Sequence, residues 1–146
     1  MKRIHIHIGV EDLDATKRFY TALFGQDPTV EKHDYMKWML DDPRINLAVS
    51  RNHTSETGVN HVGIQVESDD ELEALNAALQ AAQQATRPDP EADCCYAHSN
   101  KHWASDPQGV VWEMFHTMED IPTYYGGEVR EDIPSLPVQT SAPSCC

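Results

Sequence analysis

The sequence predicts an α+β domain built from two βαβββ modules, and three observations support this prediction. An alternating strand occurs at residues 4–10 and again at residues 60–66, with His5 and His61 at equivalent places 56 residues apart. A helical pattern of apolar residues follows each copy, and short strand-like segments follow each helix. Because self-similarity at a fixed period indicates one structural unit used twice, we expect module 1 at about residues 1–53 and module 2 at about residues 58–117.

The repeated strand has two chemically different faces, because alternate side chains of a strand point to opposite sides. In the first copy, every second residue is Ile or Val, and the other face carries His5, His7 and a glycine. The second copy has the same apolar face and presents His61 and Gln65 on the other. We expect the apolar faces to pack on helices, which leaves the imidazoles for another use.

In module 1, a helix should begin after Asp12, a suitable N-cap, and end before Gly25, which suits the position just past a helix end. Its apolar residues recur at helical spacing and are expected in the core. Three short strands should follow, at residues 29–33, 35–40 and 44–51.

In module 2, Ser68-x-x-Glu71 is a capping box that should open a helix ending near Ala85. Residues 86–93 contain two prolines and several carboxylates, which favour a loop. Weak strand patterns follow at residues 94–98 and 101–105, and residues 110–116 form a strong strand pattern that carries Glu113. Residues 118–146 are rich in proline, so we expect a C-terminal tail outside the domain.

Composition limits the classes of partner. The 146 residues carry a net charge of −13, which argues against nucleic acid or an anionic membrane, since both bind basic surfaces. No apolar run reaches the length of a membrane span, and no apolar signal core precedes the first strand, so we expect a cytoplasmic location. The sequence leaves open whether the protein is a monomer or a homodimer. The four cysteines form two adjacent pairs, Cys94-Cys95 and Cys145-Cys146, a spacing that does not suit a disulfide framework.

His5, His61 and Glu113 form the candidate metal site. Each lies on a predicted strand with apolar neighbours along the chain, and the two histidines occupy repeat-related positions. If the modules pair about a pseudo-twofold axis, both imidazoles enter one cleft. Each histidine alone could be a hydrogen-bonded structural residue. Two histidines and one carboxylate on one side of a metal, however, are the facial triad of non-haem Fe(II) oxygenases.

The same residues resemble the vicinal oxygen chelate superfamily, which includes glyoxalases, extradiol dioxygenases and fosfomycin-resistance proteins. The resemblance rests on the first strand with Asp12-Leu13, Phe19-Tyr20 and Phe24-Gly25, on Asn60-His61-Val62-Gly63, and on Asp106-Pro107-x-Gly109-(x)3-Glu113. It covers residues 4–116 and implies paired modules forming a cup-shaped mixed sheet around a divalent metal. His5, His61 and Glu113 fall where that superfamily places its ligands. Glyoxalases take a further carboxylate from the last strand of the first module, and residues 45–50 contain none.

Cys94 and Cys95 are the candidate substrate ligands. Adjacent thiols are soft donors for a thiophilic centre, although they could also be two small buried residues. Lys101, His98 and His102 could favour the thiolate, whereas Asp93 opposes it. Taken with the superfamily match, the pair resembles that of the organoarsenical carbon–arsenic lyases and the related cadmium-induced proteins. The resemblance implies that the pair captures a trivalent organoarsenical.

The resulting functional hypothesis is an Fe(II)- and O2-dependent carbon–arsenic lyase that releases arsenite from methyl or aryl arsenicals. His5, His61 and Glu113 would hold the iron, for which Ni, Co, Mn or Cd could substitute. Tyr96 and Lys101 are additional candidates for substrate binding, and His7, Gln65 and Phe115 are candidates for the pocket wall. Two alternatives remain open at this stage. One is a thiol-based cadmium or arsenite sequestering protein, and the other is a fosfomycin-type thiol transferase.

Overall fold

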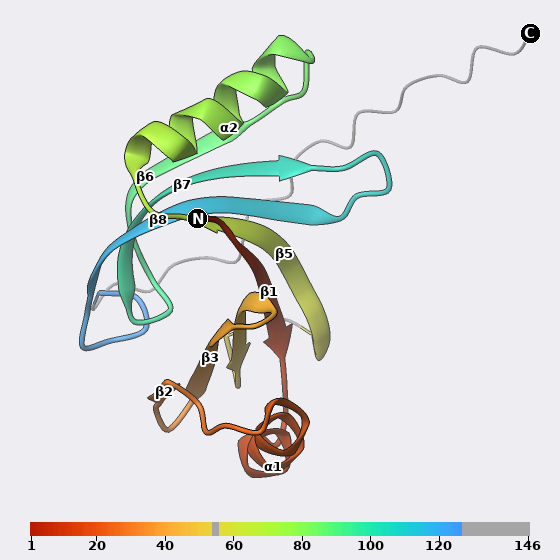
Figure 1. The fold of residues 1–146 in the computed structure, drawn as a ribbon, viewed down its shortest axis with the longest axis vertical. Coiled ribbons are helices and arrows are strands. Elements are labelled where there is room, and N and C mark those ends of the chain that lie inside the picture. Colours follow the sequence, from red (N-terminus) through yellow and green to blue (C-terminus); the bar gives the residue numbers. More distant parts are fainter. Residues whose placement is uncertain (54–55, 127–146) are drawn as a thin grey trace, which may run out of the picture.

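The computed structural model describes residues 1–53 and 56–126, which fold as eight strands in one mixed sheet with two helices outside it (Figure 1). The elements of module 1 are β1 (Arg3–Gly9), α1 (Leu13–Phe24), β2 (Val30–Glu31), β3 (Tyr35–Asp41) and β4 (Arg44–Ser50). Those of module 2 are β5 (Gly58–Val66), α2 (Asp69–Ala81), β6 (Arg87–Cys94), β7 (Ala97–Ser105) and β8 (Val111–Asp120). The predicted α+β class and the paired βαβββ modules are therefore confirmed.

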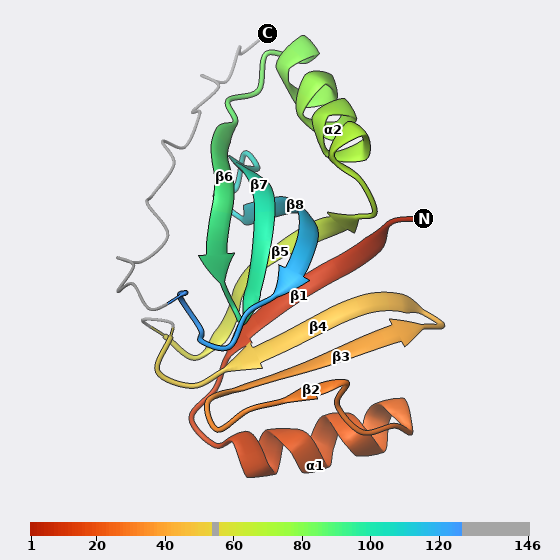
Figure 2. The same cartoon turned by 90° about the vertical axis from the view of Figure 1, so that its left-hand side faces the viewer.

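The sheet has the strand order β2-β3-β4-β1-β5-β8-β7-β6, so each half repeats the other on either side of the β1–β5 pair. β1 and β5 are antiparallel, whereas β1–β4 and β5–β8 are parallel. In the central pair His5 lies opposite Gly63 and His7 lies opposite His61, which is the register that a twofold exchange of the modules requires. The sheet curls strongly, with α1 and α2 at its opposite ends (Figure 2).

Each helix packs its apolar side on the outer face of its own module. Asp12 Oδ1 accepts from the Ala15 amide at 2.9 Å and caps α1, and Gly25 ends that helix with the positive φ of 69° expected there. Trp38, fully buried, lies at the centre of the first core. The second core joins Leu72 of α2 to Val66, Ala104 and Met114 of the sheet. The buried face of β1 is the histidine face, and the isoleucines on the other side are half-buried or exposed.

Two of the sequence predictions for module 2 are wrong. Residues 86–93 were expected as a loop, but β6 runs from Arg87 to Cys94. The two weak strands expected at 94–98 and 101–105 are replaced by a turn at residues 95–96 and one continuous strand, β7, from Ala97 to Ser105. Pro88 and Pro90 are tolerated because β6 lies at the edge of the sheet, where half of the amides have no neighbouring strand to bond. α2 ends at Ala81, four positions before the expected end near Ala85.

The second half of the chain also extends further than the predicted domain end. β8 runs to Asp120, beyond position 117, and Tyr124 is buried. The remainder of the expected tail, including Cys145 and Cys146, lies outside the described residues. Neither helix in the described part of the chain is long and apolar enough to cross a membrane.

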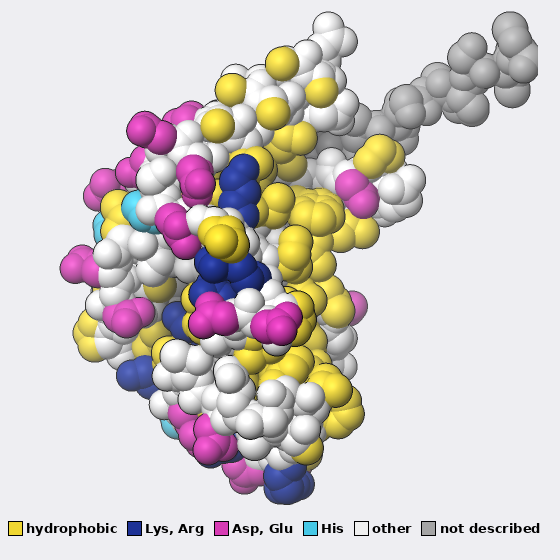
Figure 3. All heavy atoms as spheres, viewed as in Figure 1, with side chains coloured by type: hydrophobic (Ala, Val, Ile, Leu, Met, Phe, Trp, Pro, Cys, Tyr) yellow, Lys and Arg dark blue, Asp and Glu magenta, His cyan; other side chains and the backbone are white. Residues whose placement is uncertain are grey.

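Ion pairs join the two modules where β1 begins. Arg44 of β4 contacts Glu67 at 3.3 Å, and the N-terminal amine pairs with the same carboxylate. Arg3 pairs with Asp41 at 2.5 Å. Figure 3 shows Lys and Arg side chains gathered in the middle of this face with acidic side chains beside them. Since the carboxylates of these pairs are exposed to solvent, each pair contributes little to stability.

Candidate metal centre and thiol pair

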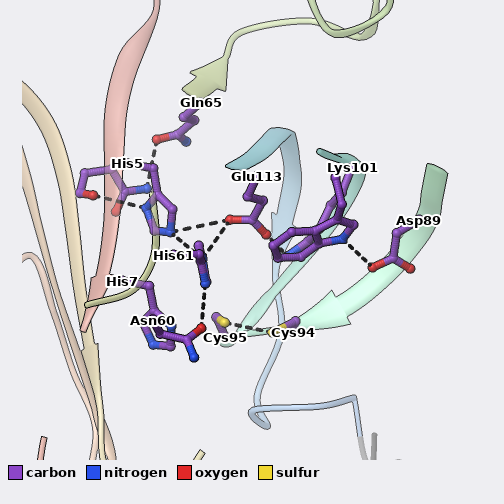
Figure 4. Close-up of polar contacts among 12 residues, drawn as sticks. His5, His7, Asn60, His61, Gln65, Asp89, Cys94, Cys95, Lys101 and Glu113 are labelled. Carbon is purple, nitrogen blue, oxygen red and sulfur yellow. Dashed lines mark hydrogen bonds and ion pairs between the residues drawn. The ribbon is translucent and has the colours of Figure 1, made fainter. Parts of the chain in front are cut away.

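Three buried side chains from three strands meet on the concave side of the sheet (Figure 4). His5 comes from β1, His61 from β5 and Glu113 from β8. The two Nε2 atoms are 3.2 Å apart, and Glu113 Oε2 lies 3.4 Å from His5 Nε2 and 3.3 Å from His61 Nε2. The fold therefore brings together the three residues that the repeat singled out.

The outer nitrogen of each imidazole is held by a carbonyl oxygen. His5 Nδ1 lies 3.1 Å from the backbone oxygen of Asn46, and His61 Nδ1 lies 2.8 Å from Asn60 Oδ1. Because a carbonyl oxygen only accepts, each Nδ1 carries the proton and donates it, and each Nε2 keeps a free lone pair. The rings are also held edge-on by aromatic neighbours, His5 by Phe115 and His61 by Trp103.

These donors fit a divalent metal. Burial lowers the pKa of His5 to about 4, despite the opposing effect of the Glu113 carboxylate, so the imidazole is neutral at pH 7. Two lone pairs and a carboxylate oxygen then face one another in a buried site, an arrangement that a cation between them would stabilise. Atoms 3.2–3.4 Å apart can all lie about 2 Å from one point, the length of a metal bond to nitrogen or oxygen.

Glu113 is fixed from two sides. Lys101 Nζ donates to Oε1 at 2.6 Å, which leaves Oε2 facing the imidazoles. Burial alone would raise the pKa of Glu113, but the Lys101 ammonium outweighs it and holds that pKa well below its usual value. Gly63 lies beside it in β5, where an added Cβ would stand 2.2 Å from the Glu113 carbonyl oxygen, so this glycine permits the close pairing of β5 with β8.

The thiol pair lies in the turn between β6 and β7. Cys94 ends β6, and Cys95 and Tyr96 form a two-residue turn in which both have a φ of 61°. Positive φ at both positions identifies a type I′ turn, which normally uses Asn and Gly. We call β6, β7 and this turn the thiol hairpin. The two Sγ atoms are 2.8 Å apart.

The two thiols differ in acidity. The hydrogen bond from Cys94, aided by Lys101, lowers the pKa of Cys95 to about 7 against the opposing effect of burial. That same bond, together with burial, raises the pKa of Cys94 well above its usual value. The pair therefore shares one proton near neutral pH and presents one thiolate.

Lys101 is the cation that acts on the thiols, and the two neighbouring histidines have other partners. Side chains alternate along β7, which places His98 and His102 on the face opposite to Lys101. His98 bonds Asp93 at 2.5 Å, and His102 bonds Glu73 of α2 at 2.8 Å. Asp93, which the sequence suggested could oppose the thiolate, is therefore paired with His98.

Tyrosines surround the thiol pair. Tyr35, Tyr96 and Tyr124 are buried in one cluster with ring centroids 5.6–5.9 Å apart, and both cysteines pack against it. A hydrogen bond of 3.4 Å joins Cys95 Sγ to Tyr124 Oη. Apolar ring faces around the sulfurs exclude water, and hydroxyl groups at their edges remain able to bond.

The two thiols, His5 and Glu113 line one cavity of about 390 Å³, part of which is open solvent. Its polar wall includes His5, His7, Asn46, Lys37, Lys101 and Glu113, and its remaining wall is formed by Tyr35, Ala48, Cys94, Cys95, Ala97, Ser99, Phe115 and Thr117. Asn46 Nδ2 donates to Gln65 at 3.0 Å, while Asn46 Oδ1 is buried without a partner among the described residues. Such an atom is a ready acceptor for a bound molecule.

The structure places the other candidates as follows. Lys101 lines the cavity, and so do His7 and Phe115, whereas Gln65 is not part of the lining and accepts from Asn46. The Tyr96 hydroxyl is engaged elsewhere, since it donates to Asp34 at 2.5 Å. His7 Nε2 bonds Ser50 Oγ at 2.9 Å.

Three residues of the site were not predicted from the sequence, namely Asp34, Asn46 and Tyr124, because none is repeat-related or stands in a motif. The one available signal was the tyrosine content: four of the five tyrosines lie in or against the thiol cluster.

Comparison with known proteins gives a consistent family. Residues 2–114 match the model of the glyoxalase/bleomycin resistance protein/dioxygenase superfamily. The chain is 37% identical over 123 residues to the trivalent organoarsenical cleaving enzyme of Bacillus sp. (strain MD1), covering 83% of this chain and 76% of that protein. It is 30% identical over 132 residues to the cadmium-induced protein CadI of Mycobacterium tuberculosis (strain H37Rv), covering 90% and 87%.

Solved structures support the fold. A variant of homoprotocatechuate 2,3-dioxygenase from B. fuscum matches with a TM-score of 0.61 at 14% identity, covering 84% of this chain and 34% of that one. The Mn(II)-bound glyoxalase from Novosphingobium aromaticivorans matches with a TM-score of 0.57 at 20% identity, covering 80% and 40%. Both are longer chains, and at these identities they bear on the fold alone.

Proposed function

This chain belongs to the glyoxalase/bleomycin resistance protein/dioxygenase superfamily, and from that premise we propose that it is an Fe(II)- and O2-dependent enzyme that cleaves the carbon–arsenic bond of trivalent organoarsenicals. Its similarity to proteins named as organoarsenical cleaving enzymes supports the substrate class. The observation that carries the proposal is the cavity that the thiol pair shares with two of the three metal-site residues, His5 and Glu113.

The dithiol accounts for capture. Trivalent arsenic is a soft centre, and thiolate sulfur is the soft donor of proteins. The Cys95 thiolate attacks first, because its pKa of about 7 leaves it about half ionised at neutral pH. In an arsenical that carries two hydroxyl groups, Cys95 replaces one and the Cys94 thiol replaces the other. Two waters leave, and the carbon substituent remains on the arsenic. Chelation by both sulfurs fixes the arsenic against the cavity wall.

His5, His61 and Glu113 would hold the metal through Nε2, Nε2 and Oε2. When bound, Fe(II) would supply electrons and open coordination positions for O2. Lys101 keeps Glu113 ionised and favours the Cys95 thiolate, so a single ammonium serves both halves of the site. The tyrosines around the sulfurs keep water from the arsenic–sulfur bonds.

Three protein ligands, without a fourth, favour oxygen chemistry over isomerisation. The equivalent of Glu113 in module 1 is Ala48, because Ala48 pairs with His7 as Glu113 pairs with Gly63. A carboxylate there would occupy a coordination position, and a methyl group leaves it open. Free thiols are also required, which suits a reducing compartment such as the cytoplasm.

The test is a single-turnover incubation of the Fe(II)-loaded protein with a trivalent methylarsenical, followed by arsenic speciation. We expect arsenite as product with O2 present and unchanged methylarsenical without it. Cys95→Ser protein, loaded with the same amount of iron, is the matched control and should release no arsenite. Arsenite formation at equal rates with and without O2 would contradict the oxygen-dependent reaction.

A second candidate is a thiol-based protein that sequesters cadmium or arsenite, which the similarity to CadI favours. It uses the same Cys94 and Cys95 but consumes no O2. An oxygen electrode distinguishes the two functions. Uptake in proportion to the arsenical added supports the enzyme, and stoichiometric metal binding without uptake supports sequestration.

A further inference from the structure

Asp34 connects the two modules, because it belongs to module 1 and bonds Tyr96, the residue next to Cys95 in the thiol hairpin. It lies in the turn between β2 and β3, is buried, and accepts two short hydrogen bonds. Tyr96 Oη donates to Oδ1 at 2.5 Å, and His53 Nε2 lies 2.6 Å from Oδ2. Burial alone would raise the pKa of Asp34, but these two hydrogen bonds outweigh it and the pKa is lowered, which keeps the carboxylate ionised.

The first branch of this network ends in the turn that carries Cys95. Tyr96 is a bulky residue with a φ of 61°, a conformation that side chains of its size rarely adopt. Strained turns of this kind persist only when the surroundings hold them. Here Asp34 bonds the Tyr96 hydroxyl, and Tyr35 and Tyr124 contact its ring. The turn therefore depends on contacts with module 1 that lie far away in the sequence.

The second branch reaches the sulfur itself. His53, in the segment that links the modules, stacks flat on Tyr124 with ring centroids 3.5 Å apart and an interplanar angle of 7°. Tyr124 Oη in turn contacts Cys95 Sγ at 3.4 Å. Both carboxylate oxygens of Asp34 thus lead, by separate routes, to the residue that presents the thiolate.

We propose that Asp34 is a positioning residue that holds the thiol hairpin in place beside the cavity that also contains His5 and Glu113. It acts through its hydrogen bond to Tyr96 and, separately, through His53 and Tyr124. We call these four residues the latch. The proposal rests on the proposed function, for which the latch keeps the captured arsenic facing His5, His61 and Glu113.

The first arm of the test measures hairpin closure without turnover. Full-length protein is alkylated with iodoacetamide, and the labelling rate at Cys94 and Cys95 is followed by peptide mass spectrometry, with Cys145 and Cys146 as an internal reference. Losing a charge-assisted hydrogen bond should raise the labelling rate of the pair on the order of tenfold in Tyr96→Phe and Asp34→Asn. Tyr20→Phe and Asp27→Asn are matched controls far from the hairpin and should label as the wild type does.

The second arm measures turnover on the same Fe(II)-loaded preparations. A loosened hairpin still binds arsenic but presents it correctly less often, so kcat for a trivalent methylarsenical should fall about tenfold while KM changes less than about twofold. Iron content should stay at the wild-type level in all variants.

The outcomes separate the latch from the proposed function. Faster labelling of the pair in Tyr96→Phe and Asp34→Asn supports the latch even if no protein cleaves an arsenical, in which case only the proposed function fails. Unchanged labelling in both variants overturns the latch. Equally fast labelling in Tyr20→Phe would also overturn it, because the effect would then reflect general loosening. Tyr96→Phe keeps the ring packing, so the test stands if Asp34→Asn fails to fold.

Discussion

The two modules share a backbone plan and divide the chemistry unequally. His5 of β1 and His61 of β5 are true equivalents, and each supplies one nitrogen to the same centre. The equivalence then breaks at the last strand, where module 2 places Glu113 and module 1 places Ala48. The duplicated frame thus supplies symmetric ligands at its axis. Where the two modules differ, module 2 contributes the carboxylate of Glu113, and the small side chain of Ala48 in module 1 leaves space in the cavity.

The turns between the second and third strands show the same division. In module 1, β2 has only two residues and its turn carries Asp34. In module 2, β6 has eight residues and its turn carries Cys95 and Tyr96. The longer hairpin reaches the shorter one, and the two turns meet through the Asp34–Tyr96 bond. Equivalent places in the fold have therefore become the two sides of a single contact.

Removing a proposed metal ligand from either module should have the largest effect, since the candidate metal centre draws residues from both. We expect His5→Ala, His61→Ala and Glu113→Ala to lose tight Fe(II) binding and all measurable arsenical cleavage while the fold is kept. Metal analysis after desalting and a thermal melt check the two halves of this expectation. A variant with wild-type iron content and activity would remove that residue from the ligand set.

Removing a thiol affects module 2 alone and should leave the metal centre intact. Cys94→Ser and Cys95→Ser replace a soft donor with a hard, barely acidic one and destroy the chelate, so cleavage should fall by about a hundredfold or more. Iron content should not change, because the ligands lie on strands away from the turn. Loss of iron together with activity would place the cysteines in the metal site and favour sequestration.

Restoring the missing symmetry tests the comparison directly. Ala48→Glu puts a carboxylate at the module 1 position that corresponds to Glu113, so we expect iron to be retained and cleavage to fall about ten- to a hundredfold as a coordination position is filled. Ala48→Gln has the same size without the charge and serves as the control. If both variants lose activity equally, the effect is filling of the cavity, and the argument from ligand number fails.

The sequence predicts what is repeated and misses what is not. The alternation of β1 and β5, the helix caps at Asp12 and Ser68, and the metal-site residues follow from local pattern or from the 56-residue offset. The strand β6 was not predicted, because Pro88 and Pro90 normally exclude a strand. Prolines are tolerated at the edge of a sheet, and that edge position is known only from the strand order of the whole sheet.

The latch could not be predicted for a related reason. Asp34 and Tyr96 are 62 residues apart in the chain, and no pattern couples them. The partners of His98 and His102 were likewise hidden, because the face of β7 that they occupy is known only once the register is known. Polar contacts between residues far apart in the chain can be identified only from a structure, whereas apolar periodicity can be read from the sequence.

A smaller effect is expected on the acidity of the thiols. Cys95 is lowered in pKa to about 7 by Cys94, Lys101 and Tyr124, against burial and the Glu113 carboxylate. The reactive thiolate is therefore present above pH 7 and lost as the pH falls below it. Alkylation of the pair should be half-maximal near pH 7, well below the usual midpoint of about 8.5. Tyr124→Phe should shift the midpoint of this pH profile upward, because the hydroxyl that favours the thiolate is removed; an unchanged midpoint would remove Tyr124 from the set.

The smallest effect concerns the C-terminal segment, which has no counterpart in module 1. The buried Tyr124 lies in this segment, and its contacts with Cys95, His53 and Tyr35 are all made within residues 1–126. A chain ending at Gly126 should therefore keep its melting temperature within about 2 °C and its cleavage rate within about twofold. A chain ending at Thr117 loses the last three residues of β8 as well as Tyr124, and its thiol pair should be alkylated several-fold faster, roughly as expected for loss of one hydrogen bond. If the chain ending at Gly126 loses activity while keeping its iron, then residues 127–146, with Cys145 and Cys146, take part in delivering the arsenical. The function would then depend on a segment outside the two modules.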